Sequence, residues 1–364
     1  MKRMLCGVSM NSRERLSSAL HLEEPDRIPI QDSFWGGFHE KMRRHLGVPE
    51  GGDVYARLGL NELSTPSTPG WCPRSAPSKV ISETDKDRIT LTDWGYVVRD
   101  LKTGATVPQF LEHPVKSPEQ LDDYLATWDQ PDKPERWGSL GQQIRSAVES
   151  RFVMPTGLEH YEAAWRVIGF QRLLEWIYKE PRALKKLLKA LTDYFVGVAR
   201  YTMDLGADGF WFYGDIADNH GPFMNRRTYQ RVFYPHHRST YQAVRRKGGL
   251  VILHTDGDVR PILPDFIEAG ITALQPIDAI AGMNVIELKP LYGEKIAFIG
   301  NIDNSNTLPF GTVDDVRREV GAKMAVAGQG GGYVCGSSHS VPDSVPVENY
   351  LALVDTVRRY GRYS

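Results

Sequence analysis

The sequence predicts an α/β fold in which short parallel strands alternate with helices, as in a barrel or in an open doubly wound sheet. Two observations predict this fold class. From residue 152 onward, short apolar runs alternate with stretches of helical periodicity, which is the order of repeated βα units. The apolar runs also lack polar–apolar alternation, as expected of strands covered on both faces. The nucleotide-binding form of the doubly wound sheet is disfavoured, because no Gly-x-Gly-x-x-Gly follows a predicted strand.

The first 150 residues predict one clear helix and an irregular region. Asn11 is a suitable N-cap, and Glu14 stands three residues later, as in a capping box. Residues 31–150 are rich in Gly, Pro and Trp and show little periodicity, so we expect an elaboration of the fold there. Within it, residues 88–100 predict extended strand and residues 102–104 a turn, which together indicate a hairpin.

From residue 152 the pattern becomes regular. A long helix is predicted to begin at Pro181, a favoured first-turn residue, and to end at Gly206. Thr312 is a predicted N-cap, with Asp315 at the third helical position. The predicted strands and apolar runs are 152–155, 209–213, 250–253, 273–275, 296–299 and 332–334, and the further predicted helices are 226–247, 262–269, 285–292, 313–324 and 346–360.

Composition and charge disfavour several classes of protein. Of the 364 residues, 41% are hydrophobic, which is enough to bury a sizeable core. The 44 Lys and Arg residues offset 45 Asp and Glu residues, so the net charge favours neither nucleic acid nor an anionic membrane surface. Three scattered cysteines form no disulfide framework, and no run approaches the ~20 apolar residues of a membrane helix. We therefore expect a cytoplasmic protein without nucleic-acid or membrane partners.

Residues with chemical function follow several of the predicted strands directly. In a barrel the carboxyl ends of all strands converge on one face, which holds the active site. Loops are polar in any protein, but four such loops in succession favour a shared site. The residues concerned are Asp215, Asp218 and His220; His254, Asp256 and Asp258; Asn301 and Asp303; and Cys335, Ser337, Ser338 and His339.

Several segments, in this order, resemble the uroporphyrinogen decarboxylase family. The resemblance implies a distorted (β/α)8 TIM barrel that forms one domain over residues 1–364, with residues 31–150 as an elaboration within it. The family contains two chemistries: decarboxylation of a tetrapyrrole without a cofactor, and methyl transfer to or from a corrinoid protein, thiol or folate, usually with zinc. The segments are 11–15, 24–30, 92–95, 254–264, 300–303, 308–311, 331–341 and 345–349.

The sequence is more similar to the methyltransferase branch. The decarboxylases carry an arginine-rich loop that grips substrate carboxylates, whereas here residues 28–36 contain no arginine and one acid. A substrate with many carboxylates requires bidentate arginine partners. The resemblance therefore implies a corrinoid-linked methyltransferase, with the corrinoid supplied by a separate partner protein. A tetrapyrrole or smaller-acid decarboxylase and a non-catalytic corrinoid or tetrapyrrole carrier remain as alternatives.

The resemblance also implies a zinc site, with one departure from the family pattern. The family has a His-x-Cys pair and a distant Cys, and the matching residues here are His254, Asp256 and Cys335. Residues i and i+2 of a strand face the same side, so His254 and Asp256 could reach one ion. A carboxylate makes the ligand set harder, which favours a methoxy or similar methylated donor over a thiol. The alternatives are an Asx-turn for Asp256 and a buried apolar position for Cys335.

The remaining candidates are assigned by their positions after the strands and by the resemblance. His339 matches the family's last active-site histidine, and with Asp215 it is a catalytic candidate. The alternatives are backbone bonding, for His339, and loop capping, for Asp215. The substrate-binding candidates are Asp218, Tyr161, Asn301 and Asp303, for which loop capping or helix packing is the alternative.

Overall fold

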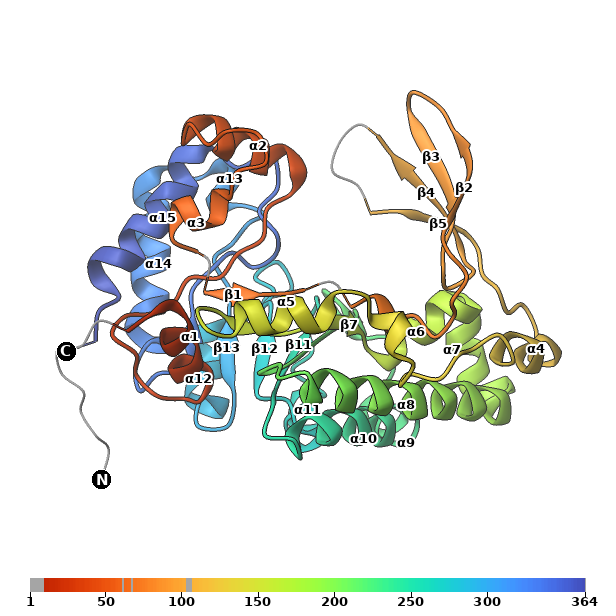
Figure 1. Cartoon of the computed structure of the whole chain (residues 1–364). Helices are drawn as coiled ribbons and strands as arrows, with labels where there is room; N and C mark the ends of the chain where they lie inside the picture. Colours follow the sequence, from red (N-terminus) through yellow and green to blue (C-terminus); the bar gives the residue numbers. More distant parts are fainter. Residues whose placement is uncertain (1–9, 61, 67, 103–106, 364) are drawn as a thin grey trace.

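A six-stranded parallel sheet forms the centre of the molecule (Figure 1). The computed structural model describes residues 10–60, 62–66, 68–102 and 107–363. The sheet has the order β14-β13-β12-β11-β8-β7. Its strands are β7 (Thr156–Leu158), β8 (Gly209–Tyr213), β11 (Leu250–His254), β12 (Ala273–Gln275), β13 (Ala297–Ile299) and β14 (Tyr333–Val334).

Further parallel pairs extend this sheet at both ends and curl it toward a barrel. Ile30 forms a parallel bridge with Cys335, directly after β14. At the other end, β6 (Phe152–Val153) pairs in parallel with β1 (Leu63–Ser64). The two ends approach each other where the backbone of Ile30 donates a hydrogen bond to the carboxylate of Glu62. The fold is the predicted distorted (β/α)8 TIM barrel, in which the closing contact is made by a side chain instead of a strand ladder.

Helices cover the outer side of the barrel, in the order the sequence predicts. The long helix begins at Pro181 as predicted, and the Thr312–Asp315 capping box is present. One prediction is wrong: the helix expected over 226–247 is two helices, which meet at Phe233 just before Pro235. The helices are α6 (His160–Ile168), α7 (Phe170–Lys179), α8 (Pro181–Asp204), α9 (Arg226–Val232), α10 (Tyr234–Arg245), α11 (Leu263–Ala269), α12 (Val285–Tyr292), α13 (Thr307–Phe310), α14 (Val313–Ala327) and α15 (Val347–Tyr360).

Helix α1 (Ser12–Leu20) fills the amino-terminal end of the barrel. Its predicted capping box between Asn11 and Glu14 is present. Arg13 pairs with Asp208, the residue that precedes β8, so the helix lies where the strands begin. Its apolar face packs against the inward-facing side chains of the strands. The carboxyl ends of the strands are therefore the open end of the barrel.

The strand side chains divide into two cores by alternation along each strand. Each strand contributes every second residue to one core. The inward core comprises Leu16, Ala19, Leu20, Phe152, Met154, Leu250, Ile252, Ala273, Ala297, Ile299 and Val334. The outward core, shared with the helices, includes Phe210, Phe212, Val251, Leu253, Leu274, Phe298, Tyr333 and Cys335. This alternation decides which residues can reach the interior of the barrel at its open end.

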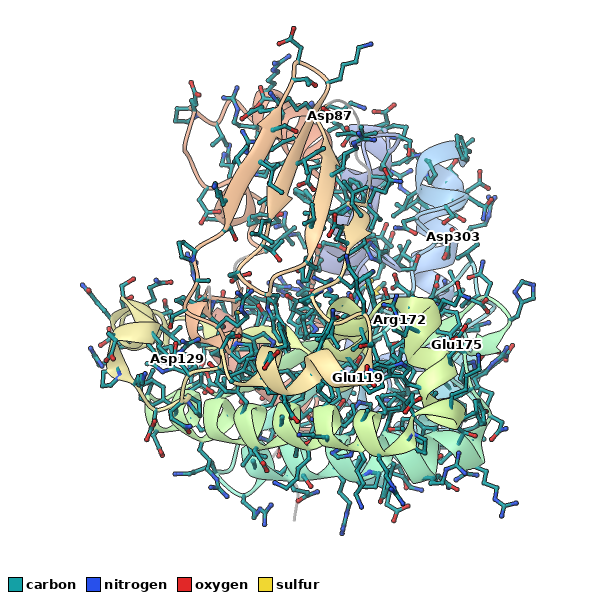
Figure 2. The ribbon with its side chains drawn as sticks, turned by 90° about the vertical axis from the view of Figure 1, so that its right-hand side faces the viewer. Asp87, Glu119, Asp129, Arg172, Glu175 and Asp303 are labelled. Carbon is teal, nitrogen blue, oxygen red and sulfur yellow. The ribbon has the colours of Figure 1, made fainter. Side chains whose placement is uncertain are left out.

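Residues 31–150 form the irregular elaboration that the sequence predicts. A four-stranded antiparallel sheet stands away from the barrel (Figures 1 and 2). Residues 88–100 are not one continuous strand, because the chain turns between Thr92 and Tyr96, with Gly95 at φ 89°. The predicted turn at 102–104 lies largely outside the described residues. The elements are α2 (Gly36–His45), α3 (Val54–Leu58), β2 (Lys79–Glu83), β3 (Asp87–Leu91), β4 (Val97–Leu101), β5 (Gln109–Glu112), α4 (Leu121–Leu125) and α5 (Leu140–Ala147). No helix among the described residues has the length and apolar character needed to cross a membrane.

Candidate active site

The open end of the barrel brings together polar side chains from four strand ends. His254 is the last residue of β11 and has the same inward orientation as Leu250 and Ile252. Asp256 follows it, Asp215 follows β8, and His339 lies in the loop after β14. The sequence therefore identified four residues that the fold places next to one another, although up to 124 positions separate them along the chain (215 to 339).

Three of these residues point their ligand atoms at a common space. The Nε2 of His254 lies 3.7 Å from Oδ1 of Asp256. The Nε2 of His339 lies 3.3 Å from Oδ2 of the same carboxylate. One ligand atom from each residue lies within 4.8 Å of the others. The side chains are 21%, 33% and 36% exposed for His254, Asp256 and His339, so solvent and small molecules can reach this group.

The charge of Asp256 organises the electrostatics of this group. Burial raises the pKa of Asp256, but His339 and the charge of His254 outweigh it, so the pKa lies below its usual range. The contact with Asp256 in turn raises the pKa of His339. Burial and the neighbouring Asp256 charge raise the pKa of Asp215, whose Oδ1 accepts the backbone N–H of Asp256 at 2.9 Å. Asp256 is thus the ionised carboxylate of the pair, and Asp215 fixes its position.

The group suits a zinc ion in donor chemistry and in spacing. Zinc accepts imidazole nitrogens and carboxylate oxygens, and two ligands about 2.0–2.1 Å from a tetrahedral ion lie roughly 3.3 Å apart. The separations of 3.3 and 3.7 Å between donor atoms approach that spacing and exceed the usual range for a strong hydrogen bond. Oδ1 of Asp256 is a buried atom that has no hydrogen-bond partner among the described residues. An unsatisfied, buried carboxylate oxygen beside two imidazoles is a fitting place for a cation.

Two neighbours of this group were not identified from the sequence. Gln275, the last residue of β12, places its Oε1 2.5 Å from Nδ1 of His254. Asp278 accepts the backbone N–H of Gly257 at 3.0 Å, and burial raises its pKa. Their position directly at or after a predicted strand was the available signal, and it applies to β12 as it does to β8 and β11.

Cys335, the third predicted zinc ligand, lies elsewhere. It continues the alternation of Tyr333 and faces the outward core, whereas Val334 faces inward. Its side chain is fully buried, and burial raises the pKa of its thiol to about 12. The structure therefore brings His254 and Asp256 together but not Cys335, and His339 lies where the third ligand was expected.

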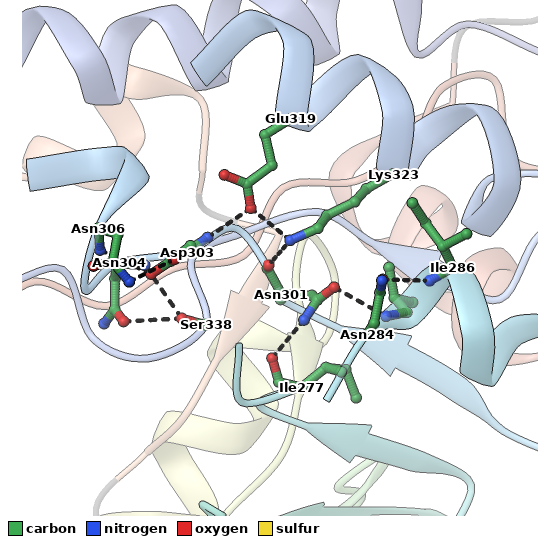
Figure 3. A network of polar contacts seen from close by, with 12 residues as sticks. Ile277, Asn284, Ile286, Asn301, Asp303, Asn304, Asn306, Glu319, Lys323 and Ser338 are labelled. Atoms are coloured by element: carbon green, nitrogen blue, oxygen red, sulfur yellow. Dashed lines mark hydrogen bonds and ion pairs between the residues drawn. The ribbon is translucent and has the colours of Figure 1, made fainter. Parts of the chain in front are cut away.

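Asn301 and Asp303 form a network of their own beside the barrel wall (Figure 3). Asn301 is fully buried with a φ of 83°, and its amide bonds to the backbone of Ile277, Met283 and Val285. Asp303 accepts backbone N–H groups of the turn that follows it. The side chains of both predicted substrate-binding residues are occupied in holding loops together.

The last two predicted substrate-binding residues also lie apart from the His254 group. Tyr161 is fully buried in α6 and stacks with Phe223. Its hydroxyl is buried without a hydrogen-bond partner among the described residues. The Asp218 side chain is 54% exposed and accepts the backbone N–H of His220 at 2.8 Å.

An arginine reaches the edge of the site through Glu162. The backbone N–H of Asp215 contacts Oε2 of Glu162 at 3.4 Å, and Oε1 of Glu162 pairs with Arg166 at 2.7 Å. The guanidinium of Arg166 also donates to the hydroxyl of Tyr96 and lies over the ring of Trp165. Its charge is therefore neutralised and enclosed within the protein. In the part of the chain that the structure describes, no Lys or Arg forms an ion pair with Asp215, Asp256 or Asp278.

A second group of histidine and carboxylate side chains lies in the helical layer. Glu159, His160 and His237 are all fully buried, with ligand atoms within 4.8 Å of one another. Here Nε2 of His237 contacts Oε2 of Glu159 at 2.6 Å. Glu159 is also the N-cap of α6 and accepts the N–H groups of Tyr161 and Glu162. Its carboxylate is already satisfied by protein donors.

Comparisons with known proteins agree with this architecture. The family model described as Uroporphyrinogen decarboxylase (URO-D) matches residues 160–360. The uroporphyrinogen decarboxylase of Actinobacillus succinogenes is 28% identical over 202 residues, 53% of this chain and 53% of that protein. The methylcobamide:CoM methyltransferase of Methanosarcina barkeri is 24% identical over 188 residues, 52% of each. The chain thus spans about half the length of these curated relatives.

A solved structure extends the similarity to nearly the whole chain. A methyltransferase from Methanosarcina mazei superposes with a TM-score of 0.67 at 18% sequence identity. The match covers 96% of this chain and 99% of that one. At this identity the likeness establishes the fold, and the residues of the site have to be argued from their own chemistry.

Proposed function

Because the chain belongs to the uroporphyrinogen decarboxylase family, we propose that it is a methyltransferase that moves a methyl group between a small methylated compound and a corrinoid protein. The observation that carries this proposal is the group of His254, Asp256 and His339 at the open end of the barrel. A metal-binding group suits the methyl-transfer branch of the family, whereas the tetrapyrrole decarboxylases need no cofactor.

His254, Asp256 and His339 would hold zinc in this proposal, with His339 in the place expected for Cys335. Zinc bound there would supply a Lewis acid for an electronegative atom of the substrate. All three donors are nitrogen or oxygen, so the set is harder than one that contains a thiolate. A harder zinc site favours a substrate oxygen over a thiolate. We therefore propose a methoxy compound as the methyl donor, and O-demethylation as the reaction.

The protein's own groups position this site. Asp215 accepts the backbone N–H of Asp256 and so holds that carboxylate toward both imidazoles. Glu162 stands behind Asp215 and keeps Arg166 occupied. The three carboxylates Asp215, Asp256 and Asp278 give this end of the barrel negative charge. That charge repels a substrate with many carboxylates, which supports methyl transfer over tetrapyrrole decarboxylation.

The corrinoid would come from a separate partner protein. The relative from Methanosarcina barkeri is named for methylcobamide as a substrate, which supports a corrinoid partner here. Helix α1 fills the amino-terminal end of the barrel, so the partner would approach from the carboxyl ends of the strands.

Metal content of the purified protein tests the site directly. We expect about one zinc per chain by elemental mass spectrometry, loss of that zinc in His254→Ala, and retention in Cys335→Ala. The cysteine variant is the matched control, since Cys335 was the ligand expected from the sequence and faces the outward core. Zinc lost in Cys335→Ala but retained in His254→Ala would overturn the proposed ligand set.

Activity tests the reaction. Reduced cob(I)alamin, used in place of the corrinoid protein, should become methylcobalamin in the presence of the zinc-loaded protein and a methoxylated aromatic compound. The visible spectrum of the corrinoid reports this change. Uroporphyrinogen should remain unchanged under the same conditions. Release of CO2 from uroporphyrinogen without methylation of cobalamin would support the decarboxylase alternative instead.

A further inference from the structure

His254 has two ring nitrogens, and the structure gives each a different environment. Nδ1 lies 2.5 Å from Oε1 of Gln275. Nε2 faces Oδ1 of Asp256 at 3.7 Å. The two environments follow from the sheet, because His254 and Gln275 are direct neighbours in the parallel pairing of β11 with β12. Their side chains therefore lie on the same, inward face of the barrel.

The contact with Gln275 determines where the imidazole carries its proton. A carbonyl oxygen can only accept a hydrogen bond, so Nδ1 of His254 has to donate. In the neutral ring the lone pair then sits on Nε2, the nitrogen that faces Asp256. Oδ1 of Asp256 has no donor among the described residues. A nitrogen lone pair and an ionised oxygen thus face each other, an arrangement that a cation between them stabilises.

The strand holds Gln275 in place for this contact. Its backbone carbonyl accepts the N–H of Thr255 at 2.9 Å, which ties it to the residue that follows His254. The opposite orientation of the Gln275 amide would direct an N–H at Nδ1. The proton of His254 would then move to Nε2 and point at Asp256, which would close the space to a metal.

We propose that Gln275 is a positioning residue that fixes His254 as its Nδ1–H tautomer and so presents Nε2 to the metal. This inference rests on the zinc site of the proposed function. Hydrogen-bond partners of metal-ligating histidines set the tautomer and the ring orientation, and their removal typically weakens metal binding by roughly 10–100-fold.

Three variants test this role in the full-length protein. In Gln275→Leu, zinc affinity measured by competition with a chromophoric chelator should fall by roughly 10–100-fold. In Gln275→Glu, which keeps an acceptor oxygen, the affinity should stay within about threefold or improve, because a carboxylate strengthens a bound imidazole as a donor. Gln242→Leu is the control, since Gln242 on α10 bonds only to the carbonyl of Ala269, remote from the site. It should leave zinc affinity unchanged.

A second measurement needs no metal. Nitrogen-15 NMR of histidine-labelled, metal-free protein, at a pH where imidazole is neutral, distinguishes the two tautomers of His254. The wild type and Gln275→Glu should show the proton on Nδ1, and Gln275→Leu should show a mixture. A purely structural role of Gln275 would lower stability without changing this spectrum.

The two measurements separate the failure of this inference from the failure of the zinc site. If the wild type binds zinc and Gln275→Leu binds it equally well with the same His254 spectrum, the role of Gln275 is overturned and the zinc site stands. If the wild type binds no zinc, the zinc site is overturned, and the metal-free spectrum alone decides. An unchanged spectrum in Gln275→Leu then refutes the positioning role, and a shift to the mixture supports it.

Discussion

The two groups of histidine and carboxylate side chains contain the same residue types and differ in everything around them. The His254, Asp256 and His339 group is partly exposed, with donor atoms 3.3 and 3.7 Å apart and one carboxylate oxygen unsatisfied. In the other group, Glu159 and His237 are 2% and 1% exposed and in contact at 2.6 Å. The comparison teaches that a metal-binding composition is not enough. A carboxylate whose oxygens are already bonded to protein donors holds the fold together, and one with an unsatisfied oxygen is available to a ligand.

Removal of the buried carboxylate should have the largest effect. Glu159→Ala leaves His237 without its acceptor and the first turn of α6 without its cap. We expect a loss of about 3–5 kcal/mol in the free energy of unfolding, as for a broken buried ion pair. Urea unfolding followed by circular dichroism measures it.

An exposed glutamate of the next helix provides the control for that measurement. Glu175 pairs with Lys179 on the surface of α7, with a side chain 41% exposed. Glu175→Ala should change the free energy of unfolding by less than about 1 kcal/mol. Equal losses in Glu159→Ala and Glu175→Ala would mean that the buried group contributes no more than a surface ion pair.

Zinc should respond to one group and not to the other. Free zinc at about 100 times its dissociation constant should raise the free energy of unfolding by about 2.7 kcal/mol. His254→Ala should abolish this stabilisation, and His160→Ala should retain it, because His160 belongs to the group whose carboxylate is already bonded. Thermal unfolding with and without zinc, and again after chelation, measures the difference. Stabilisation that survives in His254→Ala and disappears in His160→Ala would reverse the comparison.

Local signals made much of the fold predictable. The capping boxes at Asn11 and Thr312 depend on residues three positions apart, and both are present. The βα order follows from short apolar strands. The split between α9 and α10 was missed, because continuous helical periodicity conceals a break before Pro235. The turn at Thr92 was missed for a similar reason, since both flanking segments are extended.

The site was predictable where it depends on strand parity and unpredictable where it depends on loops. His254 and Asp256 were paired because positions i and i+2 share a face. Cys335 lies one position from the inward-facing Val334, and a strand as short as β14 does not reveal its parity in the sequence. The packing of Asn301 depends on contacts with residues 16–24 positions away, which no local pattern records.

A third carboxylate sharpens the comparison, because it has hydrogen bonds but no cationic partner. Asp32 accepts the backbone N–H and the hydroxyl of Ser337 at 2.8 and 2.6 Å, and the hydroxyl of Tyr350 at 3.0 Å. In the described ranges it forms no ion pair. Burial raises the pKa of Asp32 to about 7, against these three hydrogen bonds. Ser337 lies two residues before His339, so Asp32 also supports the loop that carries this histidine.

The raised pKa should make stability fall as pH rises. Between about pH 5 and pH 7 the folded protein keeps the Asp32 proton, whereas the unfolded chain, with a carboxyl pKa near 3.9, has released it. Each pH unit in this window should therefore cost about 1 kcal/mol of folding free energy. Asp32→Asn can still accept from Ser337 and donate to Tyr350, and it removes the titration. Urea unfolding at pH 5, 6 and 7 should give a flatter dependence for the variant than for the wild type. Parallel curves would show that hydrogen bonds alone keep Asp32 ionised, as an unpaired counterpart of Glu159.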